Sequence, residues 1–226
     1  MNSCESAYSS VLKRIASASR AAGRADPARL VAVGKTKPSA ALRALASLGQ
    51  RDFGENYVQE AALKQKELAD LELEWHAIGP LQSNKCRDVA RRFDWLQTLD
   101  RARLIEPLAR HRAPERAPLN VLIQVNIDDE ASKSGCAPEE VAGLAARIRA
   151  LPALHLRGLM AIPAPLPDLA RRRVAFARMR ELFDALAARD PTVDTLSMGM
   201  SDDFELAIAE GATMVRIGSA LFGPRE

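Results

Sequence analysis

Short apolar runs alternate along this chain with longer segments whose apolar residues recur at helical spacing. The run Leu30 to Val33 is closed by Gly34 and followed by Pro38, a pattern typical of a buried strand that ends in a turn. The nearly all-apolar run from Val121 to Ile127 is typical of a strand that helices cover on both faces. The runs predict strands at 30–33, 53–54, 75–78, 95–99, 121–127, 154–162, 195–197 and 214–217.

The segments between these strands predict helices. A leading helix is expected before the first strand, ending near Ala22. Asp100 is expected to cap the helix that follows the fourth strand, and Asp202 with Glu205 to form a capping pair after the seventh. The other helices are expected at 39–48, 57–68, after 83, from 138 to 151, from 168 to 188 and from 202 to about 209.

Strands and helices therefore alternate through eight strand–helix units. Such alternation requires right-handed crossovers and a mostly parallel sheet, and eight units favour closure into a (β/α)8 TIM barrel over an open doubly wound sheet. No low-complexity linker divides the chain. We expect an α/β protein in which residues 1–226 form one barrel domain with an extra N-terminal helix.

Composition narrows the class of protein. The net charge is +3 with interspersed signs, and aromatic residues make up only 4% of the chain, which does not indicate a nucleic-acid surface. No apolar run is long enough for a signal core or a membrane span. The three cysteines lack CxxC spacing and the three histidines lack zinc-ligand spacing, so neither a disulfide framework nor a metal is expected. A cytoplasmic location is expected.

Lys35 is the first candidate functional residue. It follows the first predicted strand at its carboxyl end, where barrels and open α/β sheets keep their ligands. The alternative is a solvated lysine that merely flanks a strand.

Two small-residue segments predict an anion site. Ser197 to Ser201 follows the seventh strand, and Gly218 and Ser219 follow the eighth. In barrels the loops after these two strands often bind phosphate, because small residues let backbone N–H groups approach the anion. The alternative is that these are ordinary turn residues.

Arg216 lies inside the otherwise apolar last strand and shares a face with Met214. If that face points into the barrel, the guanidinium needs an anion or a strong acceptor, because burying it unpaired is costly. The alternative is that both side chains face outward and Arg216 reaches solvent. No GxSxG motif, GxGxxG motif or P-loop stands in the chain, so hydrolase or nucleotide chemistry is not indicated.

With these features the chain resembles the pyridoxal phosphate homeostasis family. The resemblance rests on several segments together, from the first predicted strand to the last. Two departures are minor: Gly34 stands where serine is common before the lysine, and Ala77 stands where a bulkier residue is common. The segments are 33–38, 53–60, 75–85, Asn126, 133–135, 157–162, 197–203 and 215–219.

The resemblance implies a pyridoxal 5′-phosphate (PLP) site. In the family the lysine that matches Lys35 forms a Schiff base with PLP, and the fold is the type III PLP barrel without the C-terminal β-domain. By the same match Arg216 would approach the pyridine nitrogen. Ser197, Gly218 and Ser219 would hold the phosphate, and Asn56 and Met160 would contact the ring.

The resemblance also implies a role in intracellular PLP, or vitamin B6, homeostasis, with knock-on effects on amino-acid metabolism and no catalytic residues. A cation beside the pyridine nitrogen disfavours the pyridinium form and weakens the ring as an electron sink. PLP-dependent apoenzymes are possible recipients, and a monomer is the default. The alternatives are an amino-acid racemase or related PLP enzyme, with Tyr57 or His76 as a second base, and a barrel that binds another phosphorylated metabolite.

Overall fold

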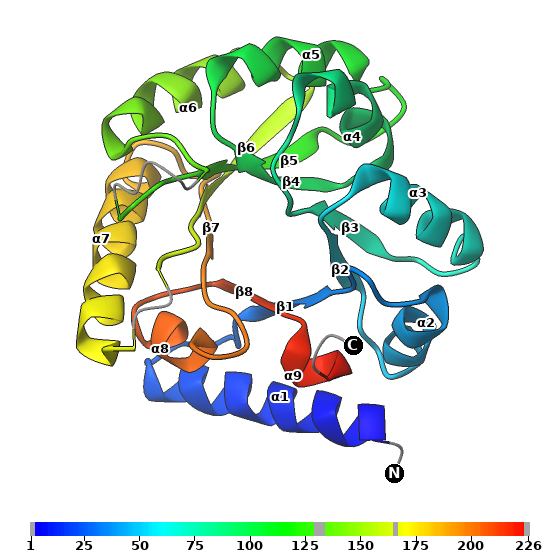
Figure 1. Ribbon diagram of the computed structural model, residues 1–226. Coiled ribbons are helices and arrows are strands. Elements are labelled where there is room, and N and C mark those ends of the chain that lie inside the picture. Colours follow the sequence, from blue (N-terminus) through cyan, green and yellow to red (C-terminus); the bar gives the residue numbers. More distant parts are fainter. Residues whose placement is uncertain (1–2, 129–133, 165–166, 224–226) are drawn as a thin grey trace.

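A closed barrel of eight parallel strands, paired in sequence order from β1 to β8 and back to β1, forms the centre of the molecule. The computed structural model describes residues 3–128, 134–164 and 167–223, so Lys133 lies outside the described residues. Helices surround the strands on the outside (Figure 1). The strands are β1 (Arg29–Val33), β2 (Asp52–Glu55), β3 (Glu74–Ala77), β4 (Trp95–Leu99), β5 (Leu119–Gln124), β6 (Leu154–Met160), β7 (Thr195–Ser197) and β8 (Met214–Ile217).

The predicted TIM barrel and its leading helix are confirmed, and each predicted strand is present. The helices are α1 (Ser3–Ala21), α2 (Ser39–Ser47), α3 (Val58–Glu67), α4 (Cys86–Arg92), α5 (Ile105–His111), α6 (Val141–Arg149), α7 (Leu169–Ala187), α8 (Phe204–Ala209) and α9 (Ser219–Phe222). Short 3-10 turns, η1 (Ser83–Lys85), η2 (Ala102–Leu104) and η3 (Pro138–Glu140), lead into α4, α5 and α6.

Two predicted helix caps are wrong. Asp100 does not cap α5, because η2 intervenes and the Asp100 carboxylate accepts a hydrogen bond from Arg101 instead. Asp202 and Glu205 do not form a capping pair: Asp203 occupies the N-cap position of α8, and Glu205 is bonded to Arg14 of α1. In both places a polar side chain near the helix start has a partner outside the helix.

The predicted strand 121–127 is also too long at its carboxyl end. β5 stops at Gln124, and beyond it Val125 makes only an isolated bridge with Cys136. The apolar run continues past the strand because Val125 and Ile127 are also buried, although they lie beyond the last residue of β5. A hydrophobic run indicates which residues are buried, and here the buried residues continue past the end of the hydrogen-bonded strand.

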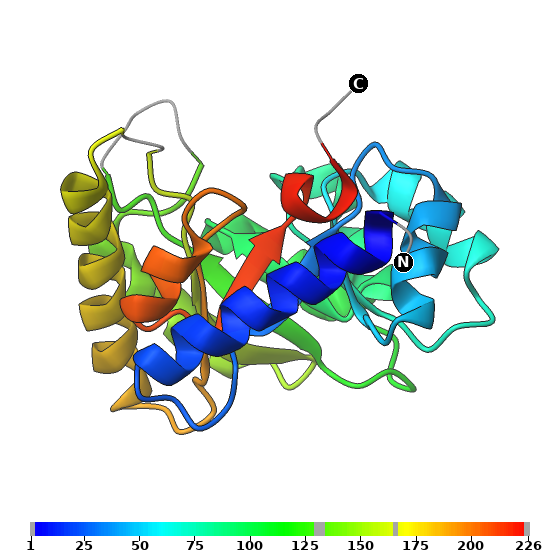
Figure 2. The same cartoon turned by 90° about the horizontal axis from the view of Figure 1, so that it is seen from below.

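Helix α1 lies outside the ring of strands, across the seam where β1 meets β8. It packs against α8 and α9, and the views in Figures 1 and 2 agree on this arrangement. Its buried face carries Tyr8, Val11 and Ile15. The seam therefore joins the first strand of the barrel to the last and is covered by the leading helix.

The barrel interior holds a small core that is separate from the larger core between strands and helices. Its apolar members come from five different strands, and each is almost fully buried. They are Val31, Trp95, Leu122, Met160 and Met214. Within the described ranges, no helix is both long and apolar enough to cross a bilayer.

Candidate functional site

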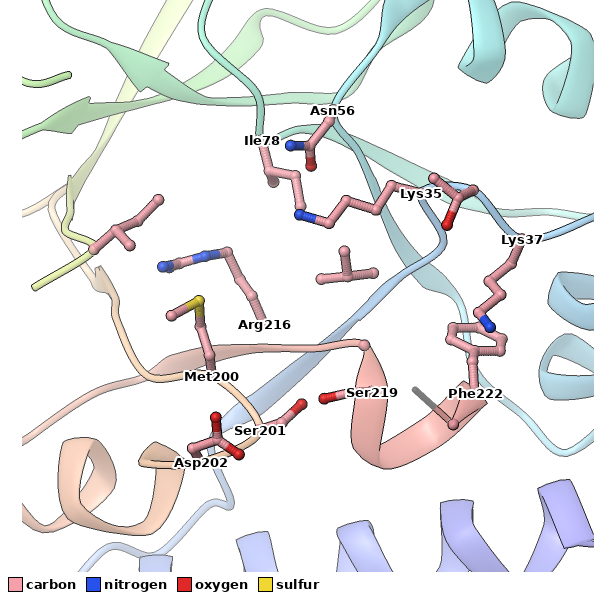
Figure 3. A pocket seen from close by; sticks show the side chains of 15 residues that line it. Lys35, Lys37, Asn56, Ile78, Met200, Ser201, Asp202, Arg216, Ser219 and Phe222 are labelled. Carbon is pink, nitrogen blue, oxygen red and sulfur yellow. The ribbon is translucent and has the colours of Figure 1, made fainter. Parts of the chain in front are cut away.

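A pocket of about 300 Å³ opens at the carboxyl ends of the strands, on the face where TIM barrels place their active sites. Its volume is at the lower end of the range for small-molecule sites. Its walls come from the segments that follow β1, β2, β3, β6, β7 and β8 (Figure 3). The lining residues are Val33, Lys35, Thr36, Lys37, Asn56, Ile78, Ile162, Met200, Ser201, Asp202, Arg216, Gly218, Ser219, Phe222 and Gly223.

Lys35 enters this pocket from the turn that follows β1. Its side chain is partly buried and extends beside Ile78 and Asn56, and its amine lies on the side of the pocket that faces Arg216 (Figure 3). An amine in a partly desolvated site is suited to covalent chemistry with a carbonyl group. This position agrees with the expectation that Lys35 lies in a pocket and does not merely flank a strand.

A cluster of charged residues from β2 and α3 holds the turn that carries Lys35. The Lys64 ammonium donates to the Gly34 carbonyl, to Glu55 Oε1 and to Glu60 Oε1, each at 2.7 Å. The Thr36 backbone N–H donates to Glu60 Oε1 at 2.6 Å. Lys64 is only 5% exposed, so these bonds are sheltered from water. The backbone on both sides of Lys35 is therefore anchored to one buried ammonium and its carboxylate partners.

In this cluster Glu55 and Glu60 share the single positive charge of Lys64, and this sharing affects the protonation of Glu55. Burial raises the pKa of Glu55 to about 7, although its bond to Lys64 acts in the opposite direction. Its Oε2 atom is buried without a hydrogen-bond partner among the described residues. Near neutral pH, Glu55 therefore exchanges between a charged and a neutral form directly behind the turn that carries Lys35.

The backbone at the turn is strained, and it is also closely packed. Thr36 has φ of 64°, a left-handed conformation that is costly for a β-branched residue. A Cβ atom on Gly34 would lie 2.6 Å from Glu55 Oε1, too close for a larger side chain without movement. The departure from serine at residue 34, noted in the sequence, thus lets the Glu55 carboxylate approach the backbone of the turn.

Arg216 supplies a buried cation at the floor of the pocket. It is 4% exposed, and its guanidinium donates to Ser197 Oγ at 2.7 Å and to the Ala161 carbonyl at 2.9 Å. No carboxylate among the described residues forms an ion pair with it, and burial lowers its pKa to about 10. The side chain faces inward, as one of the two sequence alternatives required. A buried guanidinium with only neutral partners is suited to an acceptor atom on a ligand.

The opposite wall consists of small polar residues from the loops after β7 and β8. Ser201 and Ser219 lie close together, and the Ala220 backbone N–H donates to Ser201 Oγ at 3.3 Å. Gly218 precedes the short helix α9 and is partly buried. Asp202 stands at the exposed edge of this wall (Figure 3). Hydroxyl and backbone groups gathered in this way are typical of phosphate sites in barrels.

The structure brings most of the expected site residues together and separates two of them. Lys35, Asn56, Arg216, Gly218 and Ser219 line the pocket. Met160 does not line it and belongs to the barrel core beneath. Ser197 does not line it either, since its hydroxyl is fully buried and donates to Gln97 Oε1 at 2.7 Å. In this arrangement Ser197 contacts Arg216 and reaches a pocket ligand only through it.

Sequence reasoning missed some of the residues that matter here. Lys64 carries no signal, because a lysine in an amphipathic helix normally faces solvent. Gln97 interrupts the apolar strand 95–99 and could have been recognised as an inward-facing polar residue. Arg172 stands in a run of three arginines with no sign of burial in the sequence, but it is buried and its guanidinium lies 3.4 Å from an Asp203 carboxylate oxygen.

The two residues considered as a second base do not line the pocket. His76 is fully buried inside the barrel, where Nε2 lies 2.9 Å from Asp52 Oδ1 and Nδ1 lies 3.0 Å from Gln97 Nε2. Tyr57 is 62% exposed and lines a neighbouring cavity with Gln82 and Lys85.

One group of possible metal ligands occurs among the described residues, at the other end of the barrel. It consists of Asp52, Glu74 and His76. Arg29 donates to both carboxylates, so one guanidinium already neutralises part of their charge. The geometry is that of an ion-pair network.

Comparisons with known proteins identify the family and agree with the barrel fold. Residues 9–226 match the family model described as alanine racemase, N-terminal domain. A pyridoxal phosphate homeostasis protein of Pseudomonas aeruginosa is 56% identical over 96% of this chain and 93% of its own length. One of Escherichia coli is 50% identical over 100% of this chain and 98% of its own. PipY of Synechococcus elongatus, solved with PLP bound, is 38% identical, with a TM-score of 0.81 over 94% of this chain and all of its own.

Proposed function

The chain belongs to the pyridoxal phosphate homeostasis family, within the alanine racemase N-terminal domain class, and from this premise we propose that it carries PLP on Lys35. The observation that supports the proposal most directly is the pocket itself. It places a lysine amine, a buried guanidinium and a hydroxyl-lined wall around one cavity of about 300 Å³. These groups are complementary to an aldehyde, a ring acceptor atom and a phosphate.

Each residue has a distinct part in the proposal. When bound, PLP supplies an aldehyde carbon that condenses with an amine, releasing water, and a ring that can take up electrons. Lys35 provides the amine for a Schiff base. Gly218, Ser219 and Ser201 hold the phosphate, Asn56 contacts the edge of the ring, and Arg216 donates to the pyridine nitrogen. Met160 and Ser197 support these contacts from below.

The charge of Arg216 favours holding the cofactor over turning over a substrate. A guanidinium can only donate hydrogen bonds, so the ring nitrogen beside it stays unprotonated. An unprotonated ring withdraws electrons less strongly than one paired with a carboxylic acid. We therefore propose storage or delivery of PLP in the cytoplasm, by a single-domain monomer that passes PLP to apoenzymes, with amino-acid metabolism affected indirectly.

Borohydride reduction of the purified protein, followed by intact-mass analysis, tests the proposal. Reduction fixes a Schiff base as a stable adduct, so we expect one pyridoxyl-phosphate adduct per chain. The adduct should be absent in Lys35→Ala and in Lys35→Arg, which keeps the positive charge but cannot condense. Lys66→Ala, an exposed lysine on α3, is the matched control and should keep the adduct.

Two results would contradict the proposal. An adduct that persists in Lys35→Ala would show that the covalent bond forms at another residue. The absence of an adduct on the wild-type protein after incubation with PLP would show that no Schiff base forms. Consumption or racemisation of an amino acid by the wild-type protein well above the rate with free PLP, lost in Lys35→Ala, would favour an enzyme instead.

A further inference from the structure

A chain of hydrogen bonds crosses the barrel interior from the pocket to its far end. We call it the polar column, and it consists of Arg216, Ser197, Gln97, His76 and Asp52. Arg216 bonds Ser197 at 2.7 Å, Ser197 bonds Gln97 at 2.7 Å, Gln97 lies 3.0 Å from His76, and His76 lies 2.9 Å from Asp52. The three middle residues have exposed fractions of 0%. Such groups are held only by their partners, since water does not reach them.

The chemistry of the groups fixes the direction of every bond in the polar column. Arg216 can only donate, so Ser197 Oγ accepts from it and gives its own proton to Gln97 Oε1. The amide of Gln97 must then turn its Nε2 toward His76, and His76 Nδ1 accepts. The remaining nitrogen, Nε2, carries the proton and donates to the Asp52 carboxylate. All four bonds therefore point away from the pocket.

The far end of the polar column is anchored by charges and rings. Arg29 donates to Asp52 and also to Glu74. Trp95 donates from Nε1 to Glu74 at 2.9 Å, and its ring stacks on His76 with centroids 5.3 Å apart. The imidazole is thus fixed on its face and at both nitrogens, so the polar column has a rigid base.

Arg216 has few other supports. Among the described residues its guanidinium bonds only Ser197 and the Ala161 carbonyl. The orientation of Ser197 depends on Gln97, and that of Gln97 depends on His76 and on a contact from Nε2 to Met214 Sδ at 3.2 Å. Turning the Gln97 amide over would bring its Oε1 to His76 Nδ1 and so set two acceptors against each other.

We propose that Gln97 and His76, which do not touch the pocket, are positioning residues that fix the Arg216 guanidinium for the cofactor through a one-directional hydrogen-bond chain. His76 acts in this chain as the neutral imidazole with its proton on Nε2. The effect on PLP rests on the proposed function, but the direction of the chain is a property of the protein without ligand.

The first test needs no cofactor. Nitrogen-15 NMR distinguishes the two neutral imidazole tautomers, and the chain has only His76, His111 and His155 to assign. We expect His76 to show the Nε2–H tautomer near neutral pH in the PLP-free protein. A His76 signal of the Nδ1–H tautomer, or of imidazolium, would overturn the proposal whether or not PLP binds.

The second test uses the loaded protein. Gln97→Leu removes the bonds of the central amide to Ser197 and His76, and we expect PLP binding to weaken by about tenfold or more, since a bond to a charged group is affected. We also expect a shift in the visible absorption spectrum of bound PLP. His76→Asn keeps an acceptor near the Nδ1 position and should retain most of the wild-type affinity and spectrum, whereas His76→Leu should behave like Gln97→Leu.

A matched control separates positioning from stability. Leu122→Ala opens a cavity in the same inner core and removes no hydrogen bond of the polar column, so it should lower the melting temperature but leave the spectrum of bound PLP unchanged. A wild-type spectrum and affinity in Gln97→Leu, or an equal spectral shift in Leu122→Ala, would overturn the proposal. Borohydride trapping on wild-type protein shows separately whether the proposed function holds.

Discussion

At the scale of single residues, Glu55 links the stability of the protein to pH. Its pKa in the folded protein is about 7, against an ordinary value of 4.5. The unfolded chain loses this proton near pH 4.5, whereas the folded protein keeps it until about pH 7. Between these values the folded state binds more protons, so the contribution of Glu55 to stability is present at acid pH and is lost as the pH rises.

We predict that Glu55→Gln removes this dependence. The difference between the two pKa values corresponds to roughly 3 kcal/mol of unfolding free energy lost by the wild-type protein across the window. Urea denaturation at about pH 5 and about pH 7.5 covers most of this window, and the difference between the two conditions should be smaller in the variant by roughly 2 kcal/mol. Lys35, Glu60 and Lys64 interact electrostatically with Glu55, and all three residues are present in both proteins. Equal pH dependence in the two proteins would contradict the prediction.

The sequence predicts where Lys35 and Arg216 stand along their strands, but not the depth of each side chain in the barrel. Met160 pairs with Ser197, and Ser197 pairs with Met214, so these three residues form one level. Arg216 is two residues beyond Met214 on the same strand and therefore lies one level nearer the pocket. That register depends on the stagger of a closed barrel, which local sequence patterns do not specify.

At the scale of elements, the apolar face of α1 contributes more to stability than its ion pair. Ile15 is 1% exposed, while the Arg14 and Glu205 side chains are 43% and 47% exposed. We predict that Ile15→Ala lowers the unfolding free energy by roughly 2–5 kcal/mol, and that Arg14→Ala lowers it by about 1 kcal/mol or less. Chemical denaturation measures both. Equal losses in the two variants would show that α1 is held mainly by charge.

Long helices can be predicted from the period of their hydrophobic residues, whereas very short helices cannot. The nineteen residues of α7 were predicted almost to their ends, and Asp168 caps this helix through the Ala170 and Arg171 backbone N–H groups. Helix α9 was not predicted, because four residues are too few to show a helical period. Its position is set by packing against α1, a contact between opposite ends of the sequence.

At the scale of the whole molecule, a ligand that binds only the folded barrel should stabilise it. PLP at about one hundred times its dissociation constant would add about 2.7 kcal/mol, or roughly 5–10 °C in melting temperature for a chain of this size. We predict this shift for the wild-type protein and a clearly smaller one for Lys35→Ala. Differential scanning calorimetry measures both, with pyridoxal, which lacks the phosphate, as a control that should stabilise less. Equal shifts in wild type and variant would contradict the role of Lys35.

The seam between β1 and β8 also has a consequence for protein synthesis. Lys35 follows the first strand, and Arg216, Gly218 and Ser219 belong to the last, about 180 positions later. At roughly 5–20 residues per second, a ribosome needs roughly 10–40 s to cover that distance. During this time a nascent chain has Lys35 without the pocket residues of the last strand. The pocket forms only when the barrel closes, so under the proposed function PLP would be loaded after translation of the last strand.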